Sequence, residues 1–233
     1  MRVGSLFSGI GGLDLGLERA GMTVVWQSEI NPYASRVLTK HWPSVPNLGD
    51  ITTIDWSTVE PVDLICGGYP CQPFSTAGKR AGANDARHLW PYFATALRLL
   101  RPRFALLENV TGHLGLGFDT VLADLARLGF DAEWSTVSAC SVGAPHMRER
   151  LFCLAYPESF GWDGWKRNGR PRGGESARPS TPTHWDAVRQ PGSIGLANGL
   201  RPRVVQDQLH CLGNAVVPQV AEYVGRRIMA VAA

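Results

Sequence analysis

One thiol in this chain is presented in a way that suits a nucleophile. Cys71 lies in the sequence GGYPCQP (67–73), directly after the apolar, β-prone run 62–66. Two glycines allow a sharp turn there, and Pro70 fixes the backbone before the thiol. Open α/β sheets carry their chemistry at the carboxyl ends of strands, and a thiol attacks electrophiles once its thiolate is stabilised. The alternative is a small buried thiol in a turn rich in glycine and proline.

A carboxyl group and two arginines supply further reactive side chains. Glu108 ends another apolar run, so we expect it at the same edge of the sheet as Cys71. In a half-buried cleft the pKa of a carboxyl group rises, and the group can then share or donate a proton. Arg148 and Arg150 alternate with His146 in an extended segment, which predicts all three on one face. Paired arginines bind a carboxylate, a phosphate or a base carbonyl. A helix-capping carboxylate and surface salt bridges are the structural alternatives.

A glycine loop near the start of the chain has the features of a nucleoside site. The sequence FSGIGG (7–12) follows an apolar run and precedes a helical stretch, so a ligand can approach its backbone at a helix N-terminus. Glu29 lies 20 residues after Gly9, the distance at which dinucleotide folds have a ribose-binding acid. Asp50 follows a possible third strand and is able to accept a hydrogen bond from an adenine amino group. Close packing of a helix on a strand would also explain the glycines without a ligand.

The elements that must position these residues alternate along the chain. The predicted strands are 2–7, 23–28, 62–66, 103–107, 132–138 and 151–155, and the predicted helices are 13–20, 32–41, 89–100, 118–128 and 216–231. Such alternation predicts an α/β fold with a doubly wound, mostly parallel sheet.

Residues 157–206 interrupt this alternation. They contain six prolines, eight glycines and eight basic residues against four acidic ones, without a persistent helical or strand period. We therefore predict a small loop-rich insert at 157–206 between two parts of one catalytic domain, 1–156 and 207–233. Trp162, Trp165 and Trp185 lie among its arginines, where they would contact phosphates and bases or form a small satellite cluster.

Composition restricts the function further. The chain of 233 residues suits one domain with a small addition. It contains no apolar run of about 18 residues, the length that would predict a membrane span. The N-terminal apolar run is too short for a signal peptide. Five cysteines without a Cys-x-x-Cys pair disfavour a disulfide framework and a zinc or other metal site, and predict a reducing, cytoplasmic location. A net charge of +3 permits a nucleic-acid partner without requiring one.

Taken together, these motifs resemble those of the DNA cytosine-5 methyltransferase family. The resemblance rests on FSGIGGL (7–13), GDI (49–51), PCQPFS (70–75), ENV (108–110), Arg148-x-Arg150 and GNAVVPQ (213–219), in the family's order. It implies a Rossmann-like fold and the transfer of a methyl group from S-adenosylmethionine to carbon 5 of cytosine in duplex DNA.

The resemblance also implies which residues bind the cofactor and the DNA. The cofactor pocket would comprise Phe7, Gly9, Ile10, Gly11, Gly12, Glu29, Asp50, Ile51, Pro70, Leu89, Asn214 and Val216. Within it, Glu29 would bind the ribose and Asp50 the adenine, while Asn214 and Val216 would close the pocket from the C-terminal helix. DNA would be bound by Gln72, Ser75, Lys79, Arg80 and Arg87, which follow the thiol on a polar loop that closes over the substrate.

The implied reaction assigns each catalytic residue a role. The Cys71 thiolate would add to carbon 6 of a cytosine that has been flipped out of the duplex. Glu108 would bond the N3 edge of the ring and stabilise the charge that develops there. Arg148 would hold the base carbonyl or Glu108, and Arg150 would support the loop.

The sequence departs from the family's pattern at two places. His146 stands where the family usually has glutamine, and the insert is much shorter than the usual target-recognition domain. A short insert suggests a short or loose target site, a second subunit, or a compact phage or mobile-element member, with a cognate restriction enzyme as a further possible partner. An RNA (tRNA) cytosine methyltransferase, a non-catalytic cofactor- or DNA-binding module and a nicotinamide-dependent dehydrogenase remain as alternatives.

Overall fold

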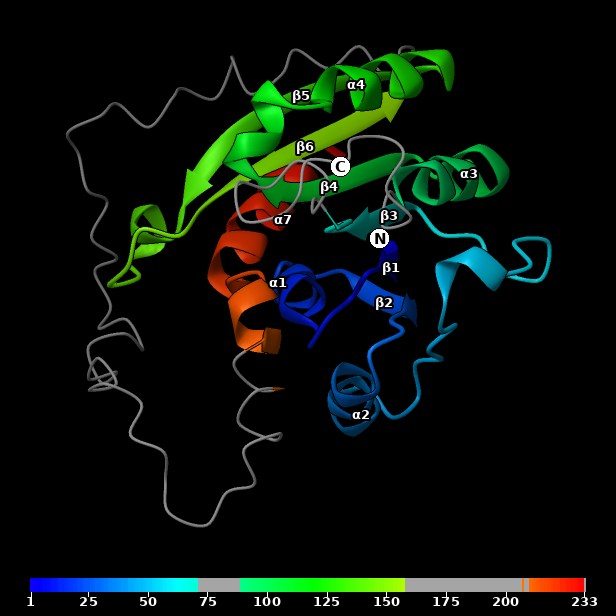
Figure 1. Cartoon of the computed structure of the whole chain (residues 1–233), viewed down its shortest axis with the longest axis horizontal. Helices are drawn as coiled ribbons and strands as arrows, with labels where there is room; N and C mark the ends of the chain where they lie inside the picture. Colours follow the sequence, from blue (N-terminus) through cyan, green and yellow to red (C-terminus); the bar gives the residue numbers. More distant parts are fainter. Residues whose placement is uncertain (71–88, 158–206, 208–209, 233) are drawn as a thin grey trace.

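A six-stranded sheet forms the centre of the molecule. The computed structural model describes residues 1–70, 89–157, 207 and 210–232 (Figure 1). The strands are β1 (Arg2–Leu6), β2 (Thr23–Ser28), β3 (Leu64–Gly67), β4 (Phe104–Val110), β5 (Phe130–Ser138) and β6 (Glu149–Pro157), in the spatial order β2-β1-β3-β4-β6-β5. β2, β1, β3 and β4 are parallel, while β6 is antiparallel to both β4 and β5. The predicted mostly parallel sheet, with its six strands, is confirmed.

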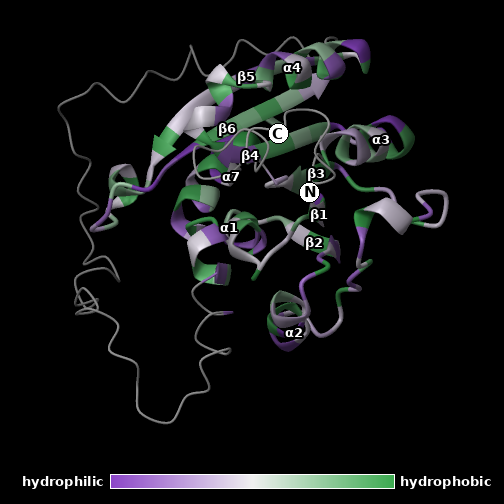
Figure 2. Cartoon of the chain, in the orientation of Figure 1, coloured by the Kyte–Doolittle hydropathy of each residue, from purple (hydrophilic) through white to green (hydrophobic). Residues whose placement is uncertain are grey.

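Helices cover both faces of this sheet. They are α1 (Gly12–Arg19), α2 (Pro32–His41), α3 (Trp90–Leu100), α4 (Phe118–Arg127) and α7 (Pro218–Ala232), with the short 3-10 helices η1 (Ile51–Thr53), η3 (Thr111–Gly115) and η4 (Ala139–Val142). Side chains of α1 and α7 pack with Leu64 and Leu106 on one face, and those of α3 and α4 pack with Ile65 and Leu107 on the other. Because side chains of a strand alternate between faces, the nearly continuous apolar strands β4 and β6 serve both layers (Figure 2).

The direction of winding changes between β1 and β3. From β1 the chain crosses through α1 to β2 on one side, whereas from β3 it continues through α3 to β4 on the other. Open α/β sheets bind ligands at such a switch point, outside the carboxyl ends of the strands. The glycine loop that follows β1 and the segment that leads from β3 to Cys71 both emerge there.

The C-terminal helix α7 returns to pack against α1 (Figure 1). A Cβ atom added at Gly16 would lie 2.3 Å from the Cβ of Ala221, and one added at Gly12 would lie 2.3 Å from the carbonyl oxygen of Val216. Glycine is therefore required for this close approach. The two ends of the chain meet as predicted, but Asn214 and Val216 precede α7, which begins at Pro218, instead of lying within it.

The surroundings of Asp50 differ from the prediction. Residues 42–50, all of them described, contain no strand, and only an isolated bridge joins Asn47 to Gln27. Asp50 instead caps η1. A run this rich in proline and polar residues cannot form a ladder, so a single backbone bridge to β2 takes the place of the expected strand.

The predicted insert 157–206 falls almost wholly outside the described residues, so its loop-rich character and the domain boundaries stay predictions. Within the described ranges, no helix has the length and apolar character that crossing a membrane requires.

Candidate active site

The glycine loop after β1 is held open by left-handed backbone and by Glu29. Phe7, Gly9 and Gly11 have φ values of 53°, 55° and 80°. The Glu29 carboxylate accepts hydrogen bonds from the N–H groups of Gly9 and Asn31, both at 2.7 Å. A Cβ at Gly9 would meet nothing within 4 Å, so the backbone there is accessible to a ligand. Glu29 thus supports the loop directly, a contact that the sequence analysis did not predict.

The residue before Asp50 is bonded to the residue before Glu29, although Asp50 does not follow a strand. The Ser28 hydroxyl, at the end of β2, donates to the carbonyl oxygen of Gly49 at 2.8 Å. Oδ1 of Asp50 accepts from the Thr52 N–H at 2.9 Å and from the Thr52 hydroxyl at 2.8 Å. Gly49 has a φ of 73° and open space where a side chain would be. Two acids therefore flank accessible glycine backbone beside the loop, as a nucleoside site requires.

A buried polar cluster that sequence reasoning missed lies beneath this loop. The Asp14 carboxylate accepts from the Ser5 hydroxyl at 3.0 Å and from Nε2 of Gln27 at 2.8 Å. The Ser8 hydroxyl donates to the Ser5 hydroxyl oxygen at 2.9 Å. Burial raises the pKa of Asp14 to about 6, against the opposing hydrogen bonds from Gln27 and Ser5. A charged residue between Leu13 and Leu17, on the apolar face of a helix, was the sequence signal for it.

Replacing Asp14 by asparagine is expected to change how stability depends on pH. The folded-state pKa of Asp14 exceeds the unfolded value, so its stabilising contribution is complete below about pH 4 and is lost as the pH rises through about 6. Asp14→Asn should therefore gain up to about 3 kcal/mol relative to the wild type between about pH 4 and pH 7. Urea unfolding across this range measures the difference, and Asp119→Asn, the same exchange on the exposed side of α4, is the control. A constant difference for Asp14→Asn would contradict the prediction.

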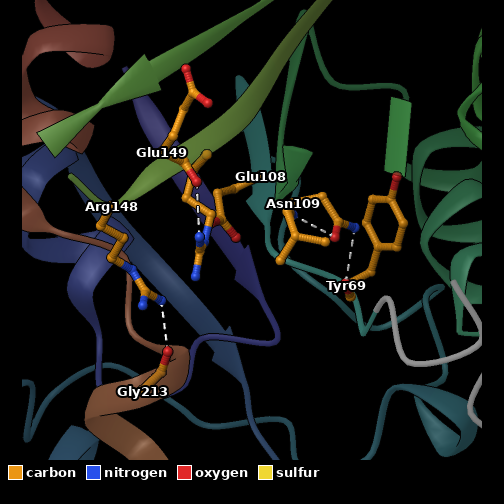
Figure 3. A network of polar contacts seen from close by, with 8 residues as sticks. Tyr69, Glu108, Asn109, Arg148, Glu149 and Gly213 are labelled. Carbon is orange, nitrogen blue, oxygen red and sulfur yellow. Dashed lines mark hydrogen bonds and ion pairs between the residues drawn. The ribbon is translucent and has the colours of Figure 1, made fainter. Parts of the chain in front are cut away.

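Glu108, in β4, is the central acid of the site (Figure 3). It is 7% exposed, and Oε1 lies 3.3 Å from Nε of Arg150. Burial raises the pKa of Glu108 to about 7, although the charges of Arg150 and Arg148 oppose this shift. Near neutral pH the group is therefore divided between its acid and carboxylate forms, which suits the donation or sharing of a proton. The predicted perturbed carboxyl group is present, and it is not a helix cap.

The contacts of Arg148 and Arg150 differ from the predicted ones, in which Arg148 was the candidate to hold Glu108. The arginine that contacts Glu108 is Arg150, because β6 runs antiparallel to β4 and pairs Arg150 with Val110. Arg148 donates from Nη2 to the carbonyl oxygen of Gly213 at 2.8 Å, and so joins this segment to the one before α7 (Figure 3). Burial, followed by the charge of Arg150, lowers the pKa of Arg148. His146 lies in a bend before β6 instead of on a regular strand face.

The segment that leads to Cys71 packs directly on Glu108. A Cβ at Gly68 would lie 2.6 Å from Oε2 of Glu108, so the Gly68 backbone and this carboxyl group are in close contact. Nδ2 of Asn109 donates to the carbonyl oxygen of Tyr69 at 3.2 Å (Figure 3). Cys71 itself and the predicted DNA contacts Gln72, Ser75, Lys79, Arg80 and Arg87 lie outside the described residues. The described residues thus show the segment that leads to Cys71, as far as Pro70, in contact with Glu108 and Asn109.

Two other cysteines are unsuitable as nucleophiles. Cys66 in β3 and Cys153 in β6 are both buried. Burial, with a contribution from the charge of Asp14, raises the pKa of the Cys66 thiol, and burial raises that of Cys153 to about 12. Neither forms a thiolate readily, which leaves the role to a thiol elsewhere.

A cavity of about 1140 Å³ opens beside the glycine loop and the arginines. Its wall includes Ile10, Gly11, Gly12 and Val216 of the predicted cofactor residues, together with Arg148 and Arg150. It also includes Val37, His41 and Trp42 from α2 and its end, which sequence reasoning missed because their contribution depends on how α2 packs. Phe7, Gly9, Glu29, Asp50, Ile51, Pro70, Leu89 and Asn214 are not part of this wall. The cavity therefore extends from the cofactor loop towards the arginines, away from Glu29 and Asp50.

Comparison with known proteins identifies the family. Residues 1–187 match the model of the C-5 cytosine-specific DNA methylase family. The chain belongs to this family. The resemblance inferred from the sequence motifs is thereby confirmed, although the motif GNAVVPQ (213–219) lies beyond the matched residues.

Relatives and solved structures agree with this assignment. The chain is 38% identical over 160 residues to the Type II methyltransferase M.NgoBI of Neisseria gonorrhoeae, which covers 66% of this chain and 50% of that protein. It is 35% identical over 161 residues to M.BsuFI of Bacillus subtilis, with 67% and 39% covered. The chain thus spans half or less of the length of these relatives.

Two solved structures share the fold. A DNMT2 variant from Spodoptera frugiperda superposes with a TM-score of 0.61 at 27% identity, over 72% of this chain and 53% of that one. A putative DNA modification methyltransferase encoded within an Escherichia coli prophage gives a TM-score of 0.59 at 30% identity, over 70% and 48%. The predicted methyltransferase-type Rossmann-like fold is confirmed.

Proposed function

We propose that this chain transfers a methyl group from S-adenosylmethionine to carbon 5 of cytosine in duplex DNA, through a covalent bond between the base and Cys71. One observation carries the proposal. The buried Glu108, with its pKa raised to about 7, lies against the segment that leads to Cys71, in a member of the cytosine-specific family. A neutral carboxyl group in that position suits the N3 edge of a cytosine ring.

The residues around the glycine loop fit the proposed cofactor. The accessible backbone at Gly9 and Gly49, flanked by Glu29 and Asp50, suits a ribose and an adenine that donate hydrogen bonds to carboxylates. Ile30 is 68% exposed beside Glu29, which gives an apolar surface to a flat ring. The proposed cofactor pocket is completed by Phe7, Ile10, Ile51, Pro70, Leu89, Asn214 and Val216. S-adenosylmethionine would supply an electrophilic methyl group on its sulfonium.

The protein's own groups would act on the base. The Cys71 sulfur would form a bond to carbon 6, which makes carbon 5 nucleophilic, and that bond would break again once carbon 5 has lost its proton. Glu108 would hold a proton at N3 and so limit the negative charge in the ring. Arg150 would keep Glu108 oriented. Nε of Arg148 is buried and lacks a hydrogen-bond partner among the described residues, so it would be free to donate to a base carbonyl.

Two segments outside the cofactor and catalytic residues are proposed to bind the DNA. The DNA strand with the flipped-out base, and its phosphates, would be contacted by Gln72, Ser75, Lys79, Arg80 and Arg87. The insert 157–206 would contribute the remaining DNA contacts. A second subunit and a cognate restriction enzyme would be further partners.

Methyl transfer to two substrates tests the proposal. The purified chain is incubated with radiolabelled S-adenosylmethionine and either duplex DNA of mixed sequence or tRNA. We expect label in the DNA, which digestion to nucleosides should assign to 5-methylcytosine. Label in tRNA alone would contradict duplex DNA as the substrate, and label in neither would contradict the proposed activity.

Asp50 can be tested against a matched aspartate. Asp50 and Asp55 make the same local turn, in which Oδ1 accepts from the N–H and the hydroxyl two residues later. Asp50→Ala should weaken S-adenosylmethionine binding about tenfold or more, because a charged hydrogen-bond acceptor is lost, whereas Asp55→Ala should not. Calorimetric titration gives both dissociation constants. Equal affinities for the two variants would remove Asp50 from the proposed pocket.

A further inference from the structure

Tyr69 and His113 form a buried polar pair inside an aromatic cluster. Tyr69 is 5% exposed and His113 1% exposed. The Tyr69 ring lies 5.3 Å from the ring of Trp90, 6.1 Å from that of Phe93 and 5.5 Å from that of His113. The packing of four rings, contributed by the segment after β3, by α3 and by η3, restricts Tyr69 to one orientation.

The hydrogen bonds of this pair define the histidine tautomer. The Tyr69 hydroxyl lies 2.7 Å from Nε2 of His113, and Nδ1 of His113 lies 2.9 Å from the carbonyl oxygen of Leu116. A carbonyl oxygen only accepts, so Nδ1 carries a proton, and Nε2 of a neutral imidazole then accepts from the Tyr69 hydroxyl. The hydroxyl therefore links the segment after β3 to η3.

Both polar ends of Tyr69 are held by the chain that follows Glu108. Its carbonyl oxygen accepts from Asn109, the residue after Glu108, and its hydroxyl donates to His113, in the 3-10 helix after β4. Gly68, directly before Tyr69, packs on Oε2 of Glu108. Three contacts on neighbouring residues thus fix the backbone that enters the thiol segment relative to the acid.

From this geometry we infer that Tyr69 and His113 are positioning residues for the proposed methyl transfer. They hold the segment that leads to Cys71 at a fixed distance from Glu108 without touching the base. The inference rests on the proposed function, because it assigns the thiol and the acid to one reaction. Sulfur attack at carbon 6 and proton sharing at N3 occur on the same ring, so a small displacement of one group against the other slows the reaction.

Tyr69→Phe tests the hydroxyl while it keeps the ring. We expect formation of the covalent adduct to slow about tenfold at saturating cofactor and DNA, with the dissociation constants of both changed less than about twofold. The probe is duplex DNA copied with 5-fluorodeoxycytidine triphosphate, so that every sequence context is present. Tyr156→Phe is the matched control, because Tyr156 is also buried but lies near the opposite end of β6.

His113 gives a second, graded comparison. His113→Gln keeps an oxygen that can accept from Tyr69, whereas His113→Phe keeps a ring without polar atoms. We expect adduct formation to decrease more in His113→Phe than in His113→Gln. In Tyr69→Phe the difference between the two His113 replacements should become smaller, because the Tyr69 hydroxyl is gone and only the contact with the Leu116 carbonyl oxygen still distinguishes them.

The outcomes separate this inference from the proposed function. An adduct in the wild type and none in Cys71→Ala supports the function, and a wild-type rate for Tyr69→Phe would then overturn the positioning role alone. If the wild type forms no adduct, hydrogen exchange of the free protein still tests the link. Exchange in both 65–70 and 108–116 should be faster in Tyr69→Phe than in Tyr156→Phe, and unchanged exchange in these segments would overturn the inference.

Discussion

Cys71→Ala should abolish methyl transfer, with a loss of more than about a thousandfold in the single-turnover rate. Without the sulfur, carbon 5 of cytosine stays a poor nucleophile, whatever holds the ring. Binding of DNA and of S-adenosylmethionine should remain within about threefold of the wild type, because the change removes one small side chain. Rapid-quench measurement of labelled methyl groups in DNA gives the rate, and filter binding gives the affinity.

A second cysteine serves as the control for this experiment. Cys140 is exposed in η4, an element separate from β3 and from the strand of Glu108, and has its sulfur 3.1 Å from the Ser138 hydroxyl. Cys140→Ala should transfer methyl groups at the wild-type rate. A Cys71→Ala protein that retains near-normal methylation would remove Cys71 as the nucleophile and with it the proposed mechanism.

Glu108→Gln should reduce the single-turnover rate by about a hundredfold or more. The amide can still form a hydrogen bond but cannot transfer a proton to the ring. Burial raises the pKa of Glu108 to about 7, so in the wild type the protonated form declines as the pH rises above that value. The contribution of Glu108 to the rate should therefore fall above about pH 7, and this limb should be missing in Glu108→Gln.

The pH profile of single-turnover methylation in the two proteins measures both effects. Glu133→Gln, on β5 and remote from the arginines, makes the same exchange of groups and should keep the wild-type profile. The affinity for S-adenosylmethionine should be unchanged in both variants, since Glu108 would contact the base in the proposed mechanism. An unaltered rate in Glu108→Gln would exclude proton sharing by this residue.

The resemblance of the motifs was sufficient to predict the fold and the family, because each motif marks the end of a helix or strand. β1 to β6 follow from apolar runs, and glycine or proline marks where several helices begin or end. Glu29 and Glu108 were expected at the sheet edge because parallel strands carry their carboxyl ends to one side. These features depend on residues that are neighbours in the sequence, and the local sequence pattern is therefore enough to predict them.

Contacts between distant segments could not be obtained in this way. The contact of Arg150 with Glu108 depends on β6 being antiparallel to β4, and the direction of a strand within a sheet leaves no mark in the local pattern. The approach of Asp14 to Gln27 likewise depends on packing.

The sequence by itself determined the types of reactive groups, their order along the chain and their position at the carboxyl ends of the strands. Only the tertiary structure decided which arginine meets the acid, which carboxyl groups have raised pKa values, and that Tyr69 connects the thiol segment to the strand of Glu108. The reason is that desolvation and hydrogen bonding depend on the few ångströms around each group, and those distances are set by segments far apart along the chain.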